Sequence, residues 1–290
     1  MDVFLQLTIA GLANGMVYAL AAVGFVVIYK SSDVINFAQG ELLLFGAYLC
    51  FTFIAQVGLP WSLGVAATLV TSVLLALLIE RLVLRPLIGE PVISMIMVTV
   101  ALSSLLRALV NGIWGSRPRS FPAFLPSTPV SLGPVTVPSD RLLTILIAGV
   151  VLGGCALFFR LSRDGIAMRA IADDQQAGLS MGISISRVLA VAWAMAAAAA
   201  AVGGMMLANI FGVSPDISFI GLRVFPVVIL GGLDSIPGAV VGGLTIALLE
   251  AWAGGYVGQG LNQIISFVVL ILVLMVRPYG LFGKPIIERV

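Results

Sequence analysis

Apolar residues fill most of the chain in long segments that short polar stretches separate. These segments cover residues 5–29, 38–56, 61–79, 92–115, 142–159, 187–210, 218–232, 238–253 and 261–276. About 20 apolar residues are enough for one helix to cross the hydrocarbon core of a bilayer. The pattern therefore predicts an all-α polytopic membrane protein in which residues 1–290 form a single transmembrane domain.

The region 218–253 leaves the number of spans open between eight and nine. Its two apolar segments, 218–232 and 238–253, are short, and the stretch Gly231–Gly238 between them contains glycine and proline. Both residue types interrupt helices. Either both segments cross the membrane or one of them is a partial, re-entrant helix, so we expect this region to be broken.

Composition excludes several classes of function. Apolar residues make up 60% of the chain and charged residues 10%, with a mean hydropathy of +1.16 and a net charge of +2. There is no histidine, Cys50 and Cys155 lie in separate apolar segments, and Pro285 follows Gly283-Lys284 where a phosphate loop needs serine or threonine. We therefore expect no catalytic residues, no metal site, no disulfide, no cofactor in this chain and no nucleic-acid partner.

The distribution of basic residues predicts which side of the membrane each loop lies on. Ten of the fifteen Lys and Arg residues lie in loops that would share one side, namely 30–37, 80–91, 160–187 and 277–290. Arg107 lies within a span, and the remaining four were assigned to the opposite side: Arg117, Arg119, Arg141 and Arg223. The positive-inside rule makes the richer side cytosolic. The N-terminus is then outside and the C-terminus cytosolic, which favours nine crossings.

Two loops are long enough to carry a function of their own. The external loop 116–140 contains six prolines and is expected to hold a small strand pair near Val130–Val137; it is either a linker or a contact surface. The cytosolic segment 160–186 predicts two short amphipathic helices, the second starting near Asp173 and Asp174. Such a pair either docks into a groove of another protein or lies on the membrane surface.

Polar residues inside the spans are candidates for a transport path, because they are costly beside lipid. Asn14 and Tyr18 share a helix face, and Asn36, Gln39 and Glu41 open the second segment. Glu41 is expected near the cytosolic interface. Further candidates, each of which is alternatively an ordinary interhelical hydrogen bond, are Arg107, Asn111, Asn209, Glu250, Asn262 and Gln263. Small residues spaced four apart predict close helix packing at Gly11/Gly15, Gly149/Gly153 and Gly238/Gly242.

Four motifs in order along the chain resemble the membrane permeases of branched-chain amino acid ABC transporters. The first runs from Tyr18 through Ile35-Asn-Phe-Ala-Gln-Gly-Glu41 to Tyr48, and the second from Arg163 to Ile183. The third is Leu230-Gly-Gly…Ser235-Ile-Pro-Gly-Ala239, and the fourth begins Arg277-Pro278. The match covers nearly the whole chain and is closest to the shorter of the two paired permease paralogues.

The resemblance implies a permease subunit of a binding-protein-dependent importer in the bacterial inner membrane, with a periplasmic N-terminus. Implied partners are a second permease chain, two cytosolic ATPase subunits that bind ATP and Mg²⁺, a periplasmic binding protein and membrane lipid. The path residues would be Asn14, Tyr18, Asn36, Phe37, Gln39 and Glu41. The residues that couple to the ATPase would be Arg163, Gly165, Met168, Arg169, Ala170, Asp173, Gly178 and Gly182.

The solute and the energy source are left open by the sequence. Similar permeases serve leucine, isoleucine and valine, whereas others carry urea, short amides or aromatic acids. Lys30 and Asp234 stand where glycine is common in the family, which is consistent with a subgroup that takes another solute. The alternative is an ion-coupled secondary transporter that acts alone, for which only Glu41 and Glu250 are available as buried acids.

Overall fold

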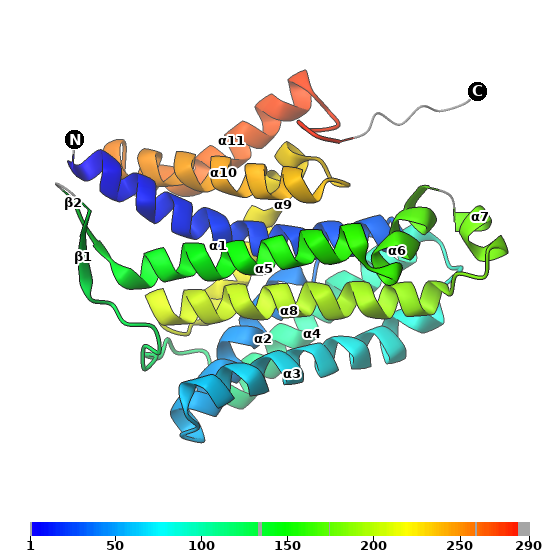
Figure 1. Cartoon of the computed structure of the whole chain (residues 1–290), viewed down its shortest axis with the longest axis horizontal. Helices are drawn as coiled ribbons and strands as arrows, with labels where there is room; N and C mark the ends of the chain where they lie inside the picture. Colours follow the sequence, from blue (N-terminus) through cyan, green and yellow to red (C-terminus); the bar gives the residue numbers. More distant parts are fainter. Residues whose placement is uncertain (1, 133–134, 174, 259, 284–290) are drawn as a thin grey trace.

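The computed structural model describes residues 2–132, 135–173, 175–258 and 260–283. Long helices lie side by side in alternating directions, with a β-hairpin at one end of the bundle and a pair of short helices at the other (Figure 1). The helices are α1 (Asp2–Ser32), α2 (Gln39–Phe51), α3 (Trp61–Ile79), α4 (Val92–Trp114), α5 (Ser139–Leu161), α6 (Arg163–Asp173), α7 (Gln175–Ser180), α8 (Ile185–Phe211), α9 (Ile220–Gly231), α10 (Ile236–Tyr256) and α11 (Leu261–Val276). The strands are β1 (Pro129–Leu132) and β2 (Val135–Pro138). We call the two ends of the bundle the hairpin end and the α6–α7 end.

The all-α membrane class that the hydropathy pattern predicts is confirmed. Each of the nine apolar segments contains a helix, and α6 and α7 form the short pair expected from the polar segment between them. Within the described residues, six helices are long and apolar enough to cross a membrane, namely α1, α3 with its extension to Leu87, α4, α5, α8 and α10. The helices α2, α9 and α11 are shorter, and the total of eight or nine crossings stays a prediction.

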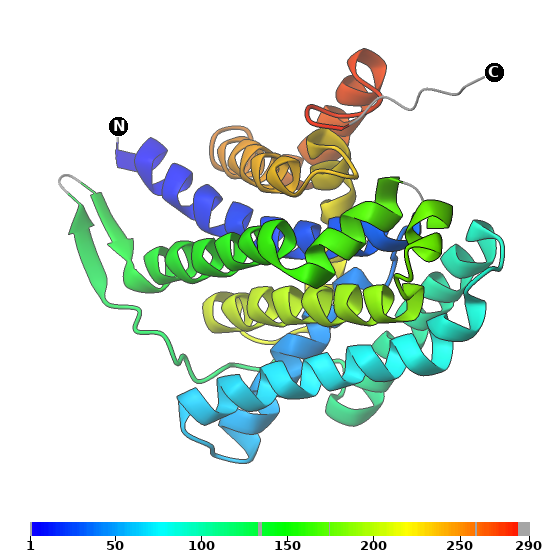
Figure 2. The same ribbon diagram turned by 45° about the vertical axis from the view of Figure 1, so that its right-hand side comes forward.

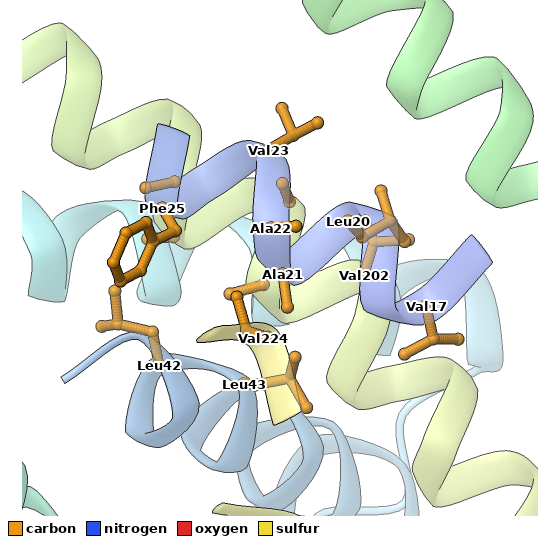
Figure 3. Close-up of a cluster of buried hydrophobic side chains, with 14 of the residues drawn as sticks. Val17, Leu20, Ala21, Ala22, Val23, Phe25, Leu42, Leu43, Val202 and Val224 are labelled. Atoms are coloured by element: carbon orange, nitrogen blue, oxygen red, sulfur yellow. The ribbon is translucent and has the colours of Figure 1, made fainter. Parts of the chain in front are cut away.

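Helix α1 lies at the centre of the bundle. It packs against α5, α8, α9 and α10, and its buried side chains form the main hydrophobic cluster with α2, α8 and α9 (Figure 3). A β-carbon added at Gly15 would lie only 2.9 Å from the Cα of Leu244, and one added at Gly242 would lie even closer to the backbone oxygen of Val227. The predicted close packing at Gly11/Gly15 and Gly238/Gly242 is thus confirmed. A β-carbon added at Gly153 would meet no described atom within 4 Å, and one added at Gly149 would meet only the end of the Met16 side chain at 3.4 Å. Among the described residues, the Gly149/Gly153 pair therefore makes no close backbone contact.

Helix α2 begins inside the bundle rather than at its end. The extended stretch 33–38 leads from the end of α1 back inward to Gln39, whose amide contacts Gly24 of α1 and donates to the carbonyl of Ala196 in α8. At 1.5 Å per residue, Gly24 lies roughly 12 Å from the end of α1 and Ala196 roughly 16 Å from the start of α8. The first turn of α2 therefore lies deep within the bundle.

Helix α9 mirrors this arrangement from the hairpin end. The chain leaves α8 at Gly212, passes a 3₁₀ turn at Pro215–Phe219 and starts α9 against the first turn of α2. Gly40 and Gly221 meet there so closely that a β-carbon on Gly221 would lie 2.6 Å from the Cα of Gly40. The region 218–253 is thus interrupted as predicted, by a break around Leu233 between the short helix α9 and the longer helix α10.

The two halves of the chain repeat one order of helices in opposite directions. Helices α1 to α4 and helices α8 to α11 each comprise a long helix, an extended stretch, a short helix and two further helices. Helix α1 packs against α10, and α8 packs correspondingly against α3 (Figure 2). Inverted repeats with interrupted helices are typical of transport proteins, because the interruptions place backbone groups at the repeat interface.

The charges separate by end, with one correction to the sequence assignment. The α6–α7 end carries Lys30, Arg81, Arg85, Arg160, Arg163, Arg169, Arg187 and Arg277, and the hairpin end carries Arg117, Arg119 and Arg141. Arg223, which the sequence assigned to the outer side, lies on α9 inside the bundle, because the chain returns inward before this helix starts. Lys284 and Arg289 lie outside the described residues.

The external loop carries the strand pair expected from its sequence. Strands β1 and β2 are antiparallel, and Val130 pairs with Val137. Asn209 of α8 holds the preceding stretch, because its side-chain oxygen accepts hydrogen bonds from the backbone N–H groups of Phe124 and Leu125, both at 3.0 Å. Asn209 thus has a structural partner at the hairpin end.

Candidate functional site

The starts of α2 and α9 meet in one place, which we call the helix junction and define as residues 35–41 and 218–223. Asn36 turns the chain toward α2, because its side-chain oxygen accepts a hydrogen bond from the Ala38 N–H at 3.0 Å. Its amide nitrogen donates to the side-chain oxygen of Gln39 at 3.4 Å. Both side chains are buried, so the junction keeps polar groups deep within an otherwise apolar bundle.

Phe37 is the residue of this stretch that turns outward. Its side chain is partly exposed, and its ring packs against Phe225 of α9 with the centroids 5.0 Å apart. Its backbone N–H donates to the Thr99 hydroxyl of α4 at 3.3 Å. The extended stretch is thereby fixed to α4 and α9, and the Phe37 ring contributes to the surface of this chain.

Glu41 and Arg107 form an ion pair beside the junction. The Nε and Nη2 atoms of Arg107 both donate to the same carboxylate oxygen, Oε1, at 3.1 and 2.5 Å. Glu41 is buried in the first turn of α2, where the helix dipole also favours a negative charge. It therefore lies within the bundle, and the expectation that it sits near the cytosolic interface was wrong, because the stretch 33–38 carries the chain inward before α2 starts.

The Arg107 guanidinium is only partly covered. Its side chain is 40% exposed, against 2% for Glu41, and it lies over the Phe219 ring at 5.3 Å. Arg107 stands seven residues before the end of α4 and fifteen after its start, so it lies well inside the span. This chain therefore presents a charged group on its side, at a depth where lipid would not solvate it.

Tyr18 belongs to a second polar cluster, which joins four helices. Its hydroxyl donates to Glu250 of α10 at 2.7 Å and accepts from Arg223 of α9 at 2.8 Å. The Ser266 hydroxyl of α11 donates to the other oxygen of Glu250, and Arg223 pairs with Glu250 at 3.5 Å. We call these four residues the ion cluster; it fixes the short helix α9 against its neighbours.

The structure brings some of the predicted path residues together and leaves others apart. Asn36, Phe37, Gln39 and Glu41 share the helix junction, whereas Tyr18 lies in the ion cluster. Asn14 is one turn from Tyr18 on α1, and its buried side-chain oxygen has no hydrogen-bond partner among the described residues. The assignment of these residues to a path stays a prediction.

The predicted coupling segment forms a compact helix pair at the α6–α7 end. Gly165 and Met168 are buried, and a β-carbon on Gly165 would lie 2.6 Å from the backbone oxygen of Phe158. Arg169 donates to the carbonyl of Arg160 at 3.1 Å and so turns back toward α5. Gly178 packs on Ile171, and Gly182 ends the pair with a φ of +81°. Arg163 and Asp173 are exposed, and Ala170 is half-buried.

The outward edge of this pair is apolar. Ile166 on α6 and Leu179 on α7 are each about half exposed, and Met181 in the following turn is 82% exposed. The helices α6 and α7 lie at one end of the bundle (Figure 1), and these three side chains are exposed there. The pair and the turn after it therefore present an apolar surface that the other described residues leave exposed.

Comparison with known proteins agrees with this architecture over the length of the chain. Residues 7–274 match the family model described as branched-chain amino acid transport system / permease component. The chain belongs to this family. Its relatives are transport permease subunits and not enzymes, which confirms the resemblance seen in the four sequence motifs.

Individual relatives cover nearly the whole chain. It is 33% identical to the high-affinity branched-chain amino acid transport system permease protein BraD of Pseudomonas aeruginosa, over 99% of this chain and 98% of that protein. It is 34% identical, with the same coverage, to the permease protein LivH of Escherichia coli. Among solved structures, PsaBC from Streptococcus pneumoniae in complex with Fab has a chain that superposes with a TM-score of 0.52 and 13% identity, covering 95% of this chain and 92% of that one. That similarity shows a shared fold.

Sequence reasoning identified the polar residues of this permease but not which of them pair. Arg107 and Glu41 are 66 positions apart, and Tyr18 and Glu250 are 232 apart. The available signal was that four of the apolar segments contain charges of opposite sign, namely Glu41, Arg107, Arg223 and Glu250. Because a charge within a span needs a partner of opposite sign, these four residues had to pair, but only the tertiary structure shows how.

Proposed function

We propose that this chain is the permease subunit of an ABC importer that carries branched-chain amino acids, or a related small polar solute, across the bacterial inner membrane. The observation that carries the proposal is the relationship to permeases of high-affinity branched-chain amino acid transport systems over almost the whole length of the chain. ATP and Mg²⁺ would bind to separate subunits. The alternating helix directions and the interrupted helices support a role in transport.

A second permease chain would cover the face that carries Arg107. A guanidinium within the span is strongly disfavoured in lipid and is stable against protein or in a water-filled path. The same face exposes Phe37 and Phe219 from the helix junction. We therefore assign this face to the interface between two permease chains, with the path running along the junction and Asn36, Phe37, Gln39 and Glu41 beside it.

The orientation follows from the charge distribution. The α6–α7 end carries most of the basic residues and would be cytosolic by the positive-inside rule. The N-terminus and the β-hairpin would then be periplasmic, where the binding protein delivers the solute to the loop 116–140. The C-terminus would be cytosolic; its last residues lie outside those that the structure describes.

The helix pair α6–α7 would dock onto an ATPase subunit. Met168 and Gly165 anchor the pair to α5, and Ile166, Leu179 and Met181 present the apolar edge. Arg163 and Asp173 are exposed at the same end and would contribute polar contacts at the rim of the docking surface. A rigid pair of this kind transmits movement of the ATPase to the permease.

Uptake by the complete complex tests the proposal. The complex, co-purified with its ATPase subunits and reconstituted in proteoliposomes with its binding protein, should take up leucine, isoleucine or valine only when ATP is present. An ionophore that collapses ion gradients should leave uptake unchanged, whereas the ion-coupled alternative requires that uptake stop. Absence of ATP-dependent uptake of all three amino acids, with a binding protein that binds them, would refute the proposed solute.

A further inference from the structure

The Arg107 and Glu41 pair is incomplete in a way that leaves donor groups available. A guanidinium has five N–H donors and a carboxylate has two oxygens. Here two donors of Arg107 go to a single oxygen of Glu41, while Oε2 of Glu41 is buried without a partner among the described residues. The Nη1 amino group of Arg107 likewise makes no hydrogen bond within the described part of the chain, and the side chain is 40% exposed.

In the other intramembrane pair the carboxylate has no unpaired oxygen, and the arginine is less exposed. Arg223 is 26% exposed, and its guanidinium is shared between Glu250 and the Tyr18 hydroxyl. Both oxygens of Glu250 are occupied, by Tyr18 and by Ser266. The ion cluster therefore satisfies its buried carboxylate, whereas Glu41 keeps an oxygen that no described residue pairs and Arg107 is the more exposed of these two arginines.

We propose that Arg107 receives the carboxylate of the solute as it passes the helix junction, and that Glu41 holds the guanidinium in position. This inference rests on the proposed function and adds a residue and a chemical class to it, because the contact requires a solute that has a carboxylate. Arginine binds carboxylates through paired N–H donors. Arg107 is the charged contact, and Glu41 is its positioning residue.

The neighbouring groups suit an amino acid with an apolar side chain. Phe219 lies beneath the guanidinium, and Phe219, Phe37 and Leu222 all expose apolar surface at the helix junction. An aliphatic side chain gains from contact with such a wall. Because Glu41 already neutralises part of the Arg107 charge, the solute carboxylate is attracted without being trapped, which a transport path requires.

The chain offers a matched control pair for testing this role. Arg85 and Glu80 also form an ion pair in which the arginine is 43% exposed and the glutamate 1%, but the pair lies at the α6–α7 end. There Arg85 uses Nε and Nη2 for the two separate oxygens of Glu80, at 3.2 and 3.1 Å. Neutralising this control pair removes one positive and one negative charge, as in the Arg107 and Glu41 pair, from side chains of similar exposure that lie away from the helix junction.

The experiment compares three double variants in the complete complex: Arg107→Gln with Glu41→Gln, the exchange Arg107→Glu with Glu41→Arg, and the control Arg85→Gln with Glu80→Gln. Neutralising both partners avoids an unpaired buried charge. Leucine uptake per assembled complex is measured with saturating loaded binding protein, together with complex yield and stimulated ATP hydrolysis. We expect the first two variants to assemble but transport about tenfold more slowly, and the control to transport like the wild type.

The outcomes separate a path role from a structural one. A structural pair would tolerate the exchange, which keeps both charges, so restored uptake in the exchange variant overturns the inference. Uptake within about twofold of wild type in the neutral variant also overturns it, since about 1.4 kcal/mol corresponds to tenfold. If neither variant assembles while the control does, the pair serves folding and the inference fails. A wild-type complex that takes up no amino acid refutes the proposed function instead.

Discussion

The Tyr18 hydroxyl shows how one atom can connect several helices inside a membrane. It lies between Glu250 and Arg223, at 2.7 and 2.8 Å, on helices that start far from α1 in sequence. Both bonds involve a charged group, and such bonds contribute more to stability than bonds between neutral groups. This arrangement supports a structural role for Tyr18 in holding α9.

The substitution Tyr18→Phe should therefore lower stability. We expect a loss of about 1–3 kcal/mol in the free energy of unfolding, because Glu250 and Arg223 would each lose a partner in a buried setting. Thermal unfolding of the purified protein in detergent measures the effect. Uptake per assembled complex should stay near the wild-type value; a larger fall in uptake than in complex yield would return Tyr18 to the transport path.

Tyr48 is a suitable control for this measurement. Its hydroxyl is also buried but has no hydrogen-bond partner among the described residues. Removing an unsatisfied buried hydroxyl deprives no other group of a bond, so Tyr48→Phe should leave the unfolding temperature unchanged or raise it slightly. Equal destabilisation by both substitutions would show that the hydrogen bonds of the Tyr18 hydroxyl do not explain the result.

At the scale of elements, the contact between the first turns of α2 and α9 depends on glycine. A β-carbon on Gly40 would lie 2.5 Å from the backbone oxygen of Ser218 and 2.8 Å from the Cα of Gly221. These are backbone atoms of another element, so they cannot move aside as the end of a side chain can. The two short helices can start next to each other only because neither carries a side chain there.

We expect Gly40→Ala to destabilise the protein by about 1–3 kcal/mol, because it overpacks this contact. The matched substitution is Gly153→Ala in α5, where nothing lies within 4 Å and alanine has the better helix propensity. Complex yield and unfolding temperature should fall for Gly40→Ala and hold for Gly153→Ala. Identical yields would mean that α2 and α9 do not meet as the structure shows.

The helix pair α6–α7 allows a test of coupling that leaves its anchors intact. Leu179 and Met181 are exposed, so Leu179→Asp combined with Met181→Asp should not disturb the packing around Met168. We expect the ATPase subunit to co-purify poorly or the loaded binding protein to lose most of its stimulation of ATP hydrolysis, since each buried apolar side chain contributes about 1.5–3 kcal/mol to docking.

The same exchange at the opposite end of the bundle controls for added charge. Val257 is 69% exposed after α10, at the hairpin end, and Val257→Asp should leave ATP hydrolysis unchanged. Normal stimulation in the double variant would place the docking surface elsewhere. Arg169 is less suited to this test, because it contacts the Arg160 carbonyl and the Phe159 ring, so its replacement would also loosen the anchoring of α6.

At the scale of the whole molecule, the two ends of the bundle should lie on opposite sides of the membrane. In a background with Cys50→Ala and Cys155→Ala, Thr136→Cys places a thiol on exposed β2 and Ser184→Cys places one before α8. A membrane-impermeant maleimide should label Thr136→Cys in intact spheroplasts and Ser184→Cys only after lysis. The reverse pattern would invert the orientation derived from the basic residues.

The sequence by itself determined the class of the protein, the position of its helices and its family. Segments such as 92–115 and 142–159 are apolar throughout, and a helix is the way such a segment satisfies its own backbone hydrogen bonds in lipid. These are local properties, so they can be read without knowing what packs against each helix. The short pair between residues 160 and 186 and the strand pair near Val130–Val137 were predicted for the same reason.

Only the tertiary structure decided where the polar residues lie and with which partners. The sequence assigned Arg223 to the outer side and Glu41 to the cytosolic interface, whereas both lie inside the bundle, because the chain turns inward before α2 and before α9. A hydropathy pattern records how apolar a segment is but not at what depth it starts. The pairs Arg107 with Glu41 and Arg223 with Glu250 join distant parts of the chain, and their choice of partner follows from helix packing, which small residues such as Gly15 and Gly40 permit.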